Sequence, residues 1–369
     1  MRTATILAAV LALLAWPVAG QDAEKAKRPA NLLTGYLDRA NIHPPIQVGP
    51  VTIFPISLSR EVALGGLLTA DEALKKKVLT VEELKSAEVA RAKFSNTSKT
   101  HMIFLMAGEV LLGGKQNRTL TTDALLGPGT STILPLYCVQ RGRWTGGKKF
   151  AGGTTVAPMS VRSKAAQGAG QRAVWTEVAR ANRRLGSRTD SDDLGEAMKK
   201  KENIERLAKI RKRLGPKWPR NCAGIVVARG GKIVSADLFN SADLFERMRD
   251  KILDSTLADV TDAKGRGKVE APTQQAVRNY LQAAYKARFI AGEQRGVGQI
   301  YHVRGARHGE TLAYEKRILA EAARLERPGP TIRYMLHTAF MEPVIPVKPP
   351  PMPAPTPRPP VRRRLQERD

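Results

Sequence analysis

One stretch near the middle of the chain, AGIVVARGGKIVSADLF (223–239), limits the possible folds more than any other. Two short apolar runs flank Gly230-Gly231, and glycines between such runs are a strong hairpin signal, because tight hairpin turns need positive φ. Ser241 then predicts the N-cap of a helix. The residues that follow place six apolar side chains on one helical face: Leu244, Phe245, Met248, Ile252, Leu253 and Leu257. The stretch predicts a β-hairpin followed directly by a packed helix.

Further strand and helix patterns lie on both sides of this hairpin. Apolar runs predict strands at 51–58, 101–114, 131–140, 297–305 and 331–340. Helical spacing is present at 70–92, 171–186, 192–215, about 273–289 and 310–326. Pro55 makes the first of these strands an expected edge strand, because proline donates no ladder hydrogen bond. The predicted fold class is α+β, with a β-rich N-terminal half and packed helices, in one large domain at 45–341.

The two ends of the chain differ from this domain. Residues 1–20 combine a charged start, a short apolar run and small residues before Gln21, which is typical of a secretory signal peptide. A retained anchor is the alternative. Residues 21–44 form a polar leader, and the proline-rich, basic tail at 342–369 is expected to be disordered. We therefore expect an exported protein, periplasmic or secreted, with no transmembrane segment.

The charge balance indicates the class of partner. The chain has 61 Lys and Arg against 34 Asp and Glu, a net charge of +27, which favours anionic partners. An anionic small molecule or an acidic envelope polymer fits this balance. The basic run at 172–220 is either a solvated helix face or a binding stripe. It lacks the interleaved aromatic residues of single-strand nucleic-acid platforms, so a nucleic-acid partner is not expected.

The chain has two cysteines, Cys138 and Cys222, which form either one disulfide or two separate buried thiols. No cluster of His, Cys, Asp and Glu has metal-ligand spacing, and we expect no metal and no cofactor.

The stretch AGEVLLGGKQNR (107–118) places polar residues beside an apolar strand. A two-residue turn at Gly113-Gly114 would set Glu109 opposite Arg118, and such a pair stabilises a ladder by roughly 0.2–1 kcal/mol. The turn gives no reason for the identities of the three residues between them: Lys115, Gln116 and Asn117. The alternatives are an ordinary hairpin and the rim of a binding pocket.

A second polar cluster, CVQRGRW (138–144), follows the next strand. Arg141 and Arg143 offer planar forks that suit carboxylate or phosphate, and Trp144 offers a stacking face. A structural role for the same residues remains open.

The pattern RHGET (307–311) matches the phosphate-binding signature of histidine phosphatases. In that family the motif opens the fold and a second catalytic histidine lies far downstream, whereas here His337 follows closely, within an apolar strand. We interpret the pattern as a loop that enters a helix, with Glu310 near the helix N-terminus, and we do not expect a catalytic His308.

These motifs in their order resemble an uncharacterised bacterial family, the ADP-ribosylglycohydrolase and rhodanese-phosphatase-superfamily-associated domain. Its members carry GEE-x-x-G-A-K-Q-N-R, then C-V-E-x-G-R-W, then a V-V-A-x-x-G-K-I-V-G-A-D-L-F hairpin, and the similarity covers about 45–260. The resemblance implies no settled activity; the family name indicates genomic association with ADP-ribose and phosphate chemistry. This chain departs from the pattern at Val110 and Gln140, where acidic residues are usual.

Carried over position by position, the resemblance implies these candidate ligand-binding residues: Glu109, Lys115, Gln116, Asn117, Arg118, Arg143 and Trp144. The favoured function is an exported binding or accessory protein that holds an anionic or sugar-containing ligand at this rim. One alternative is a hydrolase of glycosidic or ADP-ribosyl bonds with Glu109 as general acid or base, which would need a second carboxylate opposite Glu109. The other is a structural envelope protein.

Overall fold

The computed structural model describes residues 33–61, 65–84, 88–150, 155–187, 192–214, 217–259, 270–305, 308–317 and 331–341. The predicted signal peptide, the first half of the polar leader and the basic tail lie outside the described residues. The end of the leader belongs to the fold, because it contains α2 (Thr34–Leu37) and β1 (Ala40–Ile42), and Tyr36 is buried. The folded part therefore begins before residue 45.

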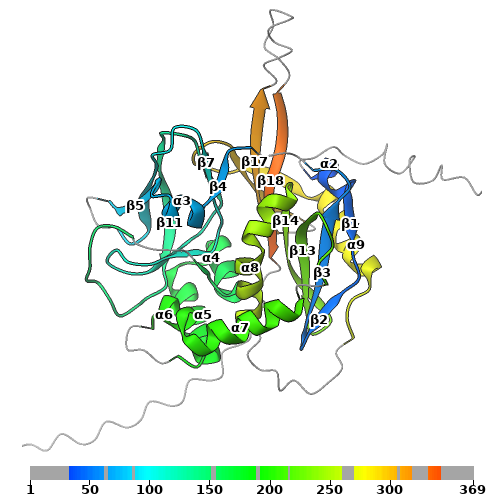
Figure 1. The fold of residues 1–369 in the computed structure, drawn as a ribbon, viewed down its shortest axis with the longest axis horizontal. Helices are drawn as coiled ribbons and strands as arrows, with labels where there is room; N and C mark the ends of the chain where they lie inside the picture. The colour runs from blue at the N-terminus through cyan, green and yellow to red at the C-terminus, as the bar shows by residue number, and fades with distance from the viewer. Residues whose placement is uncertain are drawn as a thin grey trace, which may run out of the picture.

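A nine-stranded antiparallel sheet fills one side of the molecule (Figure 1). Its order is β1-β3-β13-β14-β18-β17-β16-β15, and β2 also pairs with β3. Besides β1, its strands are β2 (Ile46–Val48), β3 (Val51–Leu58), β13 (Cys222–Arg229), β14 (Lys232–Phe239), β15 (Arg288–Ala291), β16 (Gln299–Arg304), β17 (Gly309–Arg317) and β18 (Thr331–Met341). The hairpin predicted around Gly230-Gly231 is confirmed as β13 and β14. The last described strand, β18, lies between β17, which precedes it in the chain, and β14, which is far from it in sequence.

The prediction that residues 51–58 form an edge strand is wrong. β3 pairs with β13 on one side and with β1 and β2 on the other. Pro55 is tolerated because β2 pairs with β3 only up to Ile53 and β1 only from Ile56. The missing N–H of Pro55 falls in this gap, where its carbonyl accepts a hydrogen bond from the backbone N–H of His43 (2.9 Å).

Two smaller sheets make up most of the N-terminal half. The six-stranded sheet has the order β12-β8-β9-β11-β6-β5, and the three-stranded sheet has the order β10-β7-β4. Their strands are β4 (Leu67–Thr69), β5 (Leu79–Glu83), β6 (Arg91–Asn96), β7 (Met102–Leu105), β8 (Glu109–Leu111), β9 (Arg118–Leu120), β10 (Ala124–Leu126), β11 (Ser131–Cys138) and β12 (Thr155–Val156). The α+β class, the β-rich N-terminal half and the single domain are confirmed.

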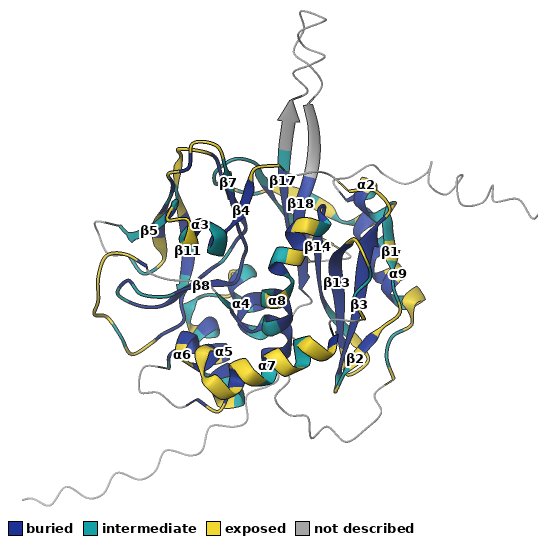
Figure 2. Ribbon diagram, in the orientation of Figure 1, coloured by how far each residue is buried: buried dark blue, intermediate teal, exposed yellow. Residues whose placement is uncertain are grey.

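Helices separate and cover the sheets. They are α3 (Ala70–Lys75), α4 (Met159–Ala166), α5 (Gln171–Arg184), α6 (Leu194–Lys199), α7 (Lys201–Leu214), α8 (Ala242–Ala258), α9 (Gln274–Gln282) and the 3-10 helix η2 (Ala283–Lys286). The Ser241 hydroxyl caps α8 by accepting a hydrogen bond from the backbone N–H of Leu244 (3.2 Å). All six apolar side chains predicted for its face are buried, and α8 lies at the centre of the molecule (Figure 2). α2 and α9 cover the other face of the large sheet.

Two predicted helices are partly or wholly strands. In the stretch 70–92 the helix α3 ends near Lys77, whose φ is +57°, and β5 follows, with Leu79 and Val81 turned into the core. The stretch 310–326 begins with β17, because β16 and β18 pair with it from both sides. Tertiary pairing outweighs local helix propensity at both places.

Cys138 and Cys222 are both buried and unpaired, so the separate-thiol alternative describes this structure. Within the residues that the structure describes, no helix is long and apolar enough to cross a membrane.

Candidate functional site

The polar stretch at 107–118 does not form the predicted hairpin register. Leu111 pairs with Arg118, and Val110 pairs with Thr119, so Glu109 is not opposite Arg118 and that prediction is wrong. A two-residue turn does not form, because the Asn117 side chain closes a longer loop by accepting a hydrogen bond from the backbone N–H of Gly113 (2.8 Å). Both glycines of this loop have positive φ.

Arg118 forms a buried ion pair inside the six-stranded sheet. Its guanidinium lies 2.7 Å from the Glu83 carboxylate, and the two side chains are 0% and 2% exposed. The same guanidinium donates to the backbone carbonyl of Glu88 (2.9 Å) and lies over the Phe150 ring. Glu83 also accepts a hydrogen bond from the backbone N–H of Lys115 (3.0 Å). The pair therefore holds the loop to β5.

The amide of Asn117 belongs to a second internal network. Its Nδ2 donates to both carboxylate oxygens of Asp193 (2.9 and 3.0 Å), and Asp193 also accepts from Nε2 of Gln140 (2.8 Å). All three nitrogens of Arg143 donate to protein oxygens, including Oε1 of Gln140 and the carbonyl of Gly114. The polar identities in the two motifs thus join three chain segments.

The predicted rim residues other than Glu109 are brought together, but few of them reach the surface. Four are buried: Glu109, Gln116, Asn117 and Arg118. The Lys115 ammonium lies 5.1 Å from the centre of the Trp144 ring, and Trp144 is 45% exposed. Ligand binding by these residues stays a prediction.

Glu109 lies apart from this loop network. Its carboxylate accepts from the Lys251 ammonium of α8 (2.9 Å) and from the backbone N–H of Met106 (3.1 Å). Lys251 also lies 2.6 Å from Asp71. Burial lowers the pKa of Lys251, but Glu109 and Asp71 outweigh burial and raise it above its usual value. The group from the later half of the chain that contacts Glu109 is therefore the cation Lys251, whereas the hydrolase alternative needs a carboxylate there.

A different cluster of charged side chains lies where the large sheet meets the smaller ones. His337 of β18 is fully buried, with Nδ1 2.6 Å from Oδ2 of Asp123 and Nε2 3.3 Å from Oδ1 of Asp237. Burial lowers the pKa of His337, but Asp123 and then Asp237 outweigh this effect and raise the pKa to about 9. The ring is therefore charged at neutral pH and held between two carboxylates.

Arg162 of α4 completes the charge balance of the cluster. Its Nη2 lies 2.6 Å from Oδ1 of Asp237, and its Nε donates to the carbonyl of Ala107 (2.9 Å). Burial raises the pKa of Asp237, but Arg162 and His337 outweigh it, so the pKa lies well below the usual range. Gly108 makes this contact possible, because a Cβ there would meet Cγ of Arg162 at 2.5 Å.

Glu310 of β17 carries the one strongly raised carboxyl pKa near this cluster in the described part of the chain. Its Oε1 accepts from the Thr122 hydroxyl (2.6 Å) and from the backbone N–H of Asp123 (3.0 Å). Burial and then the Asp123 charge raise the pKa of Glu310 to about 7. His302 lies 3.8 Å away, and burial lowers the pKa of that ring, so it adds little positive charge. Glu310 is poised between its acid and base forms at neutral pH.

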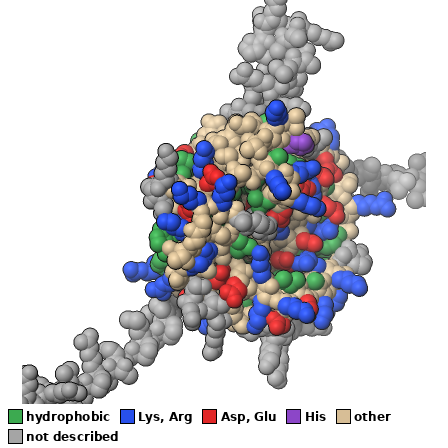
Figure 3. All heavy atoms as spheres, turned by 60° about the vertical axis from the view of Figure 1, so that its left-hand side comes forward, with side chains coloured by type: hydrophobic (Ala, Val, Ile, Leu, Met, Phe, Trp, Pro, Cys, Tyr) green, Lys and Arg blue, Asp and Glu red, His purple; other side chains and the backbone are tan. Residues whose placement is uncertain are grey.

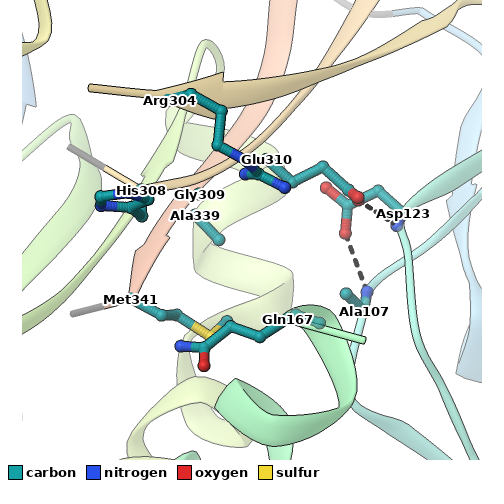
Figure 4. Close-up of a pocket in the computed structure, with 10 residues that line it drawn as sticks. Ala107, Asp123, Gln167, Arg304, His308, Gly309, Glu310, Ala339 and Met341 are labelled. Carbon is teal, nitrogen blue, oxygen red and sulfur yellow. Dashed lines mark hydrogen bonds between the residues drawn. The ribbon is translucent and has the colours of Figure 1, made fainter. Parts of the chain in front are cut away.

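Asp123 and Glu310 line a pocket of about 240 Å³. Figure 4 shows their carboxyl groups together at one end of the pocket and the His308 ring at the opposite end. Arg304 of β16 reaches between them, while Gln167, Ala339 and Met341 are also part of the lining. The pocket therefore combines a titratable carboxyl, an ionised carboxylate and a cation within a small volume.

The pattern RHGET contributes to this pocket in an unexpected way. Glu310 lies in a strand rather than at the predicted helix N-terminus, so that interpretation is wrong. His308 lines the pocket with Glu310, while Arg307 lies outside the described residues. A catalytic role of His308 remains untested.

Sequence reasoning missed the members of this cluster: Asp123, Arg162, Asp237, Glu310 and His337. A signal existed for two of them. Asp237 and His337 are the titratable residues of the largely apolar stretches VSADLF and MLHTAF, and a charged group in a buried strand needs a partner there. Within the described ranges, no group of three or more His, Cys, Asp or Glu has a geometry that could hold a metal ion.

Comparison with protein families gives one match. The model of the ARG and Rhodanese-Phosphatase-superfamily-associated Protein domain matches residues 39–323, which is well over half of the 369-residue chain, and the chain belongs to this family. The match extends the resemblance of about 45–260 in both directions and includes Glu310. No curated protein and no solved structure is significantly similar to the chain.

Proposed function

We propose that this member of the ARG and Rhodanese-Phosphatase-superfamily-associated family is an acid–base enzyme that hydrolyses a small anionic substrate, with Glu310 as its proton-transferring group. One observation carries the proposal: Glu310 is a buried carboxyl that lines a pocket and has a pKa of about 7. General acid–base catalysis is most effective when the pKa of the group lies near the working pH. Burial and then the negative charge of Asp123 disfavour the ionised form of Glu310 and raise its pKa to this value.

The pocket limits the substrate class. Its volume of about 240 Å³ lies below the roughly 300–1,000 Å³ of sites for drug-sized ligands, so it takes one compact group. Arg304 supplies a guanidinium for a phosphate or carboxylate. Pairs of carboxyl groups, one protonated and one ionised, are typical of glycoside hydrolysis. We therefore favour a glycosidic or ribosyl bond that carries an anionic group nearby.

Glu310 replaces Glu109 as the proposed acid. Glu109 is fixed by Lys251 and the backbone of Met106, and it is not among the residues that line this pocket. The proposal that a ligand binds at the Lys115–Trp144 rim is independent of this choice. It rests on the exposed Trp144, on the partly buried Lys115 beside it and on the family motifs.

A binding protein without catalysis is the second candidate. The cation Arg304 and the apolar side chains of Ala339 and Met341 favour it, because they suit retention of an anion and need no proton transfer. The pocket would then hold the anionic or sugar-containing ligand that composition predicts.

The test is a comparison of Glu310→Gln with Glu293→Gln, an exposed glutamate on the loop before β16. Thermal-shift screening with phosphate, ADP-ribose and phosphosugars identifies a ligand, since binding to the native state raises the melting temperature. Turnover of the ligand class is then followed against pH. We expect Glu310→Gln to reduce kcat by about 10²-fold or more and to remove the limb near pH 7, with Glu293→Gln unchanged.

The outcomes separate the two candidates. Binding that survives in Glu310→Gln without turnover in the wild type supports the binding protein. A ligand shift that is lost in Arg304→Ala but retained in Arg288→Ala, its cross-strand partner, assigns the ligand to this pocket. Equal shifts in both arginine variants would contradict it.

We also propose that the protein is exported. The support is the sequence pattern of residues 1–20. Intact-mass analysis of the exported fraction is expected to give Gln21 as the first residue. Full-length chain in the cytoplasm alone would contradict this proposal.

A further inference from the structure

A second hollow lies on α5, away from the pocket of Glu310. Its volume is about 620 Å³, and it is lined by residues of α5, of the segment after β11 and of the segment before α6: Arg141, Arg172, Trp175, Thr176, Val178, Ala179, Arg183 and Asp192. None of them lines the pocket of Glu310. We call this hollow the arginine groove.

The sequence of α5 explains the shape of the groove. Arg172, Thr176, Ala179 and Arg183 follow one another at spacings of four, three and four residues, which places them on one helical face. Small side chains lie between two arginines that are eleven residues apart, which is about 16 Å along a helix. The groove is therefore an elongated floor with a cation at each end.

The third arginine stands beside the only aromatic residue of the lining. The Arg141 guanidinium lies 5.4 Å from the centre of the Trp175 ring, a cation–π contact that orients the fork. Arg141 belongs to the CVQRGRW motif, but it takes no part in the network of Arg143 described above. Arg141 therefore contributes to the arginine groove rather than to the loop network around Asn117 and Arg143.

The groove arginines differ from their neighbours on the same helix. Arg180 is paired with Glu177, and Arg184 with Asp259. Within the part of the chain that the structure describes, no ion pair forms at Arg141, Arg172 or Arg183. Figure 3 shows that basic side chains are spread over this side of the molecule with acidic ones among them, so basic charge alone does not define a site. The site is defined instead by three arginines around one hollow, and Asp192 is the only acidic residue among the described residues that line it.

We propose that the arginine groove binds a carboxylate-bearing polysaccharide chain. Arginine forks match carboxylates in a bidentate manner, and a chain with repeated carboxylates can reach both ends of the groove. Trp175 and Ala179, which are both partly exposed, offer apolar surface for sugar rings, which a polyphosphate chain lacks. A single-stranded nucleic acid would need several stacking aromatic residues, and the lining has one.

The experiment measures binding of a labelled oligogalacturonate of defined length to the full chain by fluorescence anisotropy. The matched variants remove the same charge from two exposed helices: Arg172→Ala with Arg183→Ala on α5, and Lys209→Ala with Arg213→Ala on α7. We expect the α5 variant to weaken binding about tenfold or more, because it removes charge-assisted hydrogen bonds at both ends. The α7 variant is expected to lose less than about threefold, as for a distant screened charge.

Two further measurements sharpen the test. Arg141→Lys keeps the charge but loses the fork, and it is expected to weaken binding by about threefold or more. Glu310→Gln is expected to bind normally, which separates the groove from the proposed catalytic pocket. The proposal is overturned if the wild type shows no saturable binding, or if the α5 and α7 variants lose affinity equally. Tighter binding of oligo-dT or polyphosphate of equal charge would also overturn it.

Discussion

The loop around Arg118 and the cluster around His337 are both built from buried charges, and they differ in what those charges face. In the loop network, Arg118, Asn117 and Arg143 bind protein groups that hold segments together. In the cluster, Asp123 and Glu310 are tied to the protein on one side and open to a pocket on the other. Only the second arrangement leaves a proton that can be gained or lost near neutral pH.

This difference distinguishes buried charges that stabilise the fold from buried charges that could take part in proton transfer. The Arg143 guanidinium makes five hydrogen bonds to protein oxygens, one for each of its N–H groups, so it has no donor left to orient a ligand, and its removal leaves those acceptors without this partner. A carboxyl group whose ionised form is disfavoured by burial and by a neighbouring charge is prepared for proton transfer. The polar residues of the 107–118 loop belong to the first class, whereas Glu310 of the RHGET pattern belongs to the second.

The largest expected effect is on the loop network. Arg118→Ala leaves Glu83 as a buried, uncompensated charge, and we expect a loss of about 3–5 kcal/mol in the free energy of unfolding. Chemical denaturation measures it. The control is Lys149→Ala, which removes the exposed partner of Glu82 and is expected to cost less than about 1 kcal/mol. An equal loss of unfolding free energy in the two variants would contradict a structural role for the buried Arg118–Glu83 pair.

The next effect concerns the pH dependence of stability. Folding raises the pKa of His337 from 6.5 to about 9, so the stabilisation from its charge is complete below pH 6.5 and is lost as the pH rises through 9. We expect a loss on the order of 3 kcal/mol across this window. Denaturation at several pH values is the measurement.

Glu310 acts in a lower window, because its pKa rises from 4.5 to about 7. The free energy of unfolding is therefore also expected to decrease as the pH rises from 4.5 to about 7, because Glu310 ionises in the unfolded state before it ionises in the folded state. A His337→Gln variant should lose the decline above pH 7 and keep the one below it. Direct titration of the His337 ring by NMR checks the same pKa if that variant does not fold. A ring that titrates near pH 6.5 would contradict the cluster description.

A smaller effect is expected at Asn117. Its replacement by alanine removes two hydrogen bonds from Asp193 and one from the backbone of Gly113. We expect a cost of about 1–3 kcal/mol in the free energy of unfolding. An unchanged denaturation midpoint, combined with loss of a ligand, would instead favour the rim as a binding site.

The smallest effect is expected at Trp144. The side chain is half exposed and its polar neighbour is the Lys115 ammonium, so Trp144→Ala should change the free energy of unfolding by less than about 1 kcal/mol. Phe150→Ala, which removes a buried ring beside Arg118, is the contrasting variant and should cost several times more. If Trp144→Ala abolishes binding of a ligand at this small cost, the rim prediction gains direct support.

Local patterns predicted the elements whose signals lie within a few residues. The glycine turn of β13 and β14 and the Ser241 cap of α8 depend on backbone conformation and periodicity alone, and both are confirmed. The helix predicted at 310–326 fails because β17 is paired on both sides, by the preceding strand β16 and the following strand β18, and these pairings lie outside the segment itself. Local propensity cannot register such partners.

The pocket was beyond sequence reasoning for the same reason. Asp123, His337 and Asp237 come from three different parts of the chain, and Asp123 is separated from His337 by 214 positions. Their pKa shifts arise from mutual distance and burial, neither of which a sequence states. The loop at 107–118 could be recognised from the sequence because its polar residues are neighbours along the chain. Such a motif does not show whether its side chains are accessible to a ligand.

The position of β18 between β14 and β17 has a consequence for the order in which the molecule is assembled. Until that strand is inserted, the large sheet exists as two separate pieces, and Asp123 and Asp237 have no imidazolium between them. Contacts of such long range form slowly, since a large loop must close before they contribute. A nascent chain that has emerged only as far as β17 therefore carries the proposed proton donor without its surroundings. The proposed proton transfer by Glu310 therefore requires that β18 is in place.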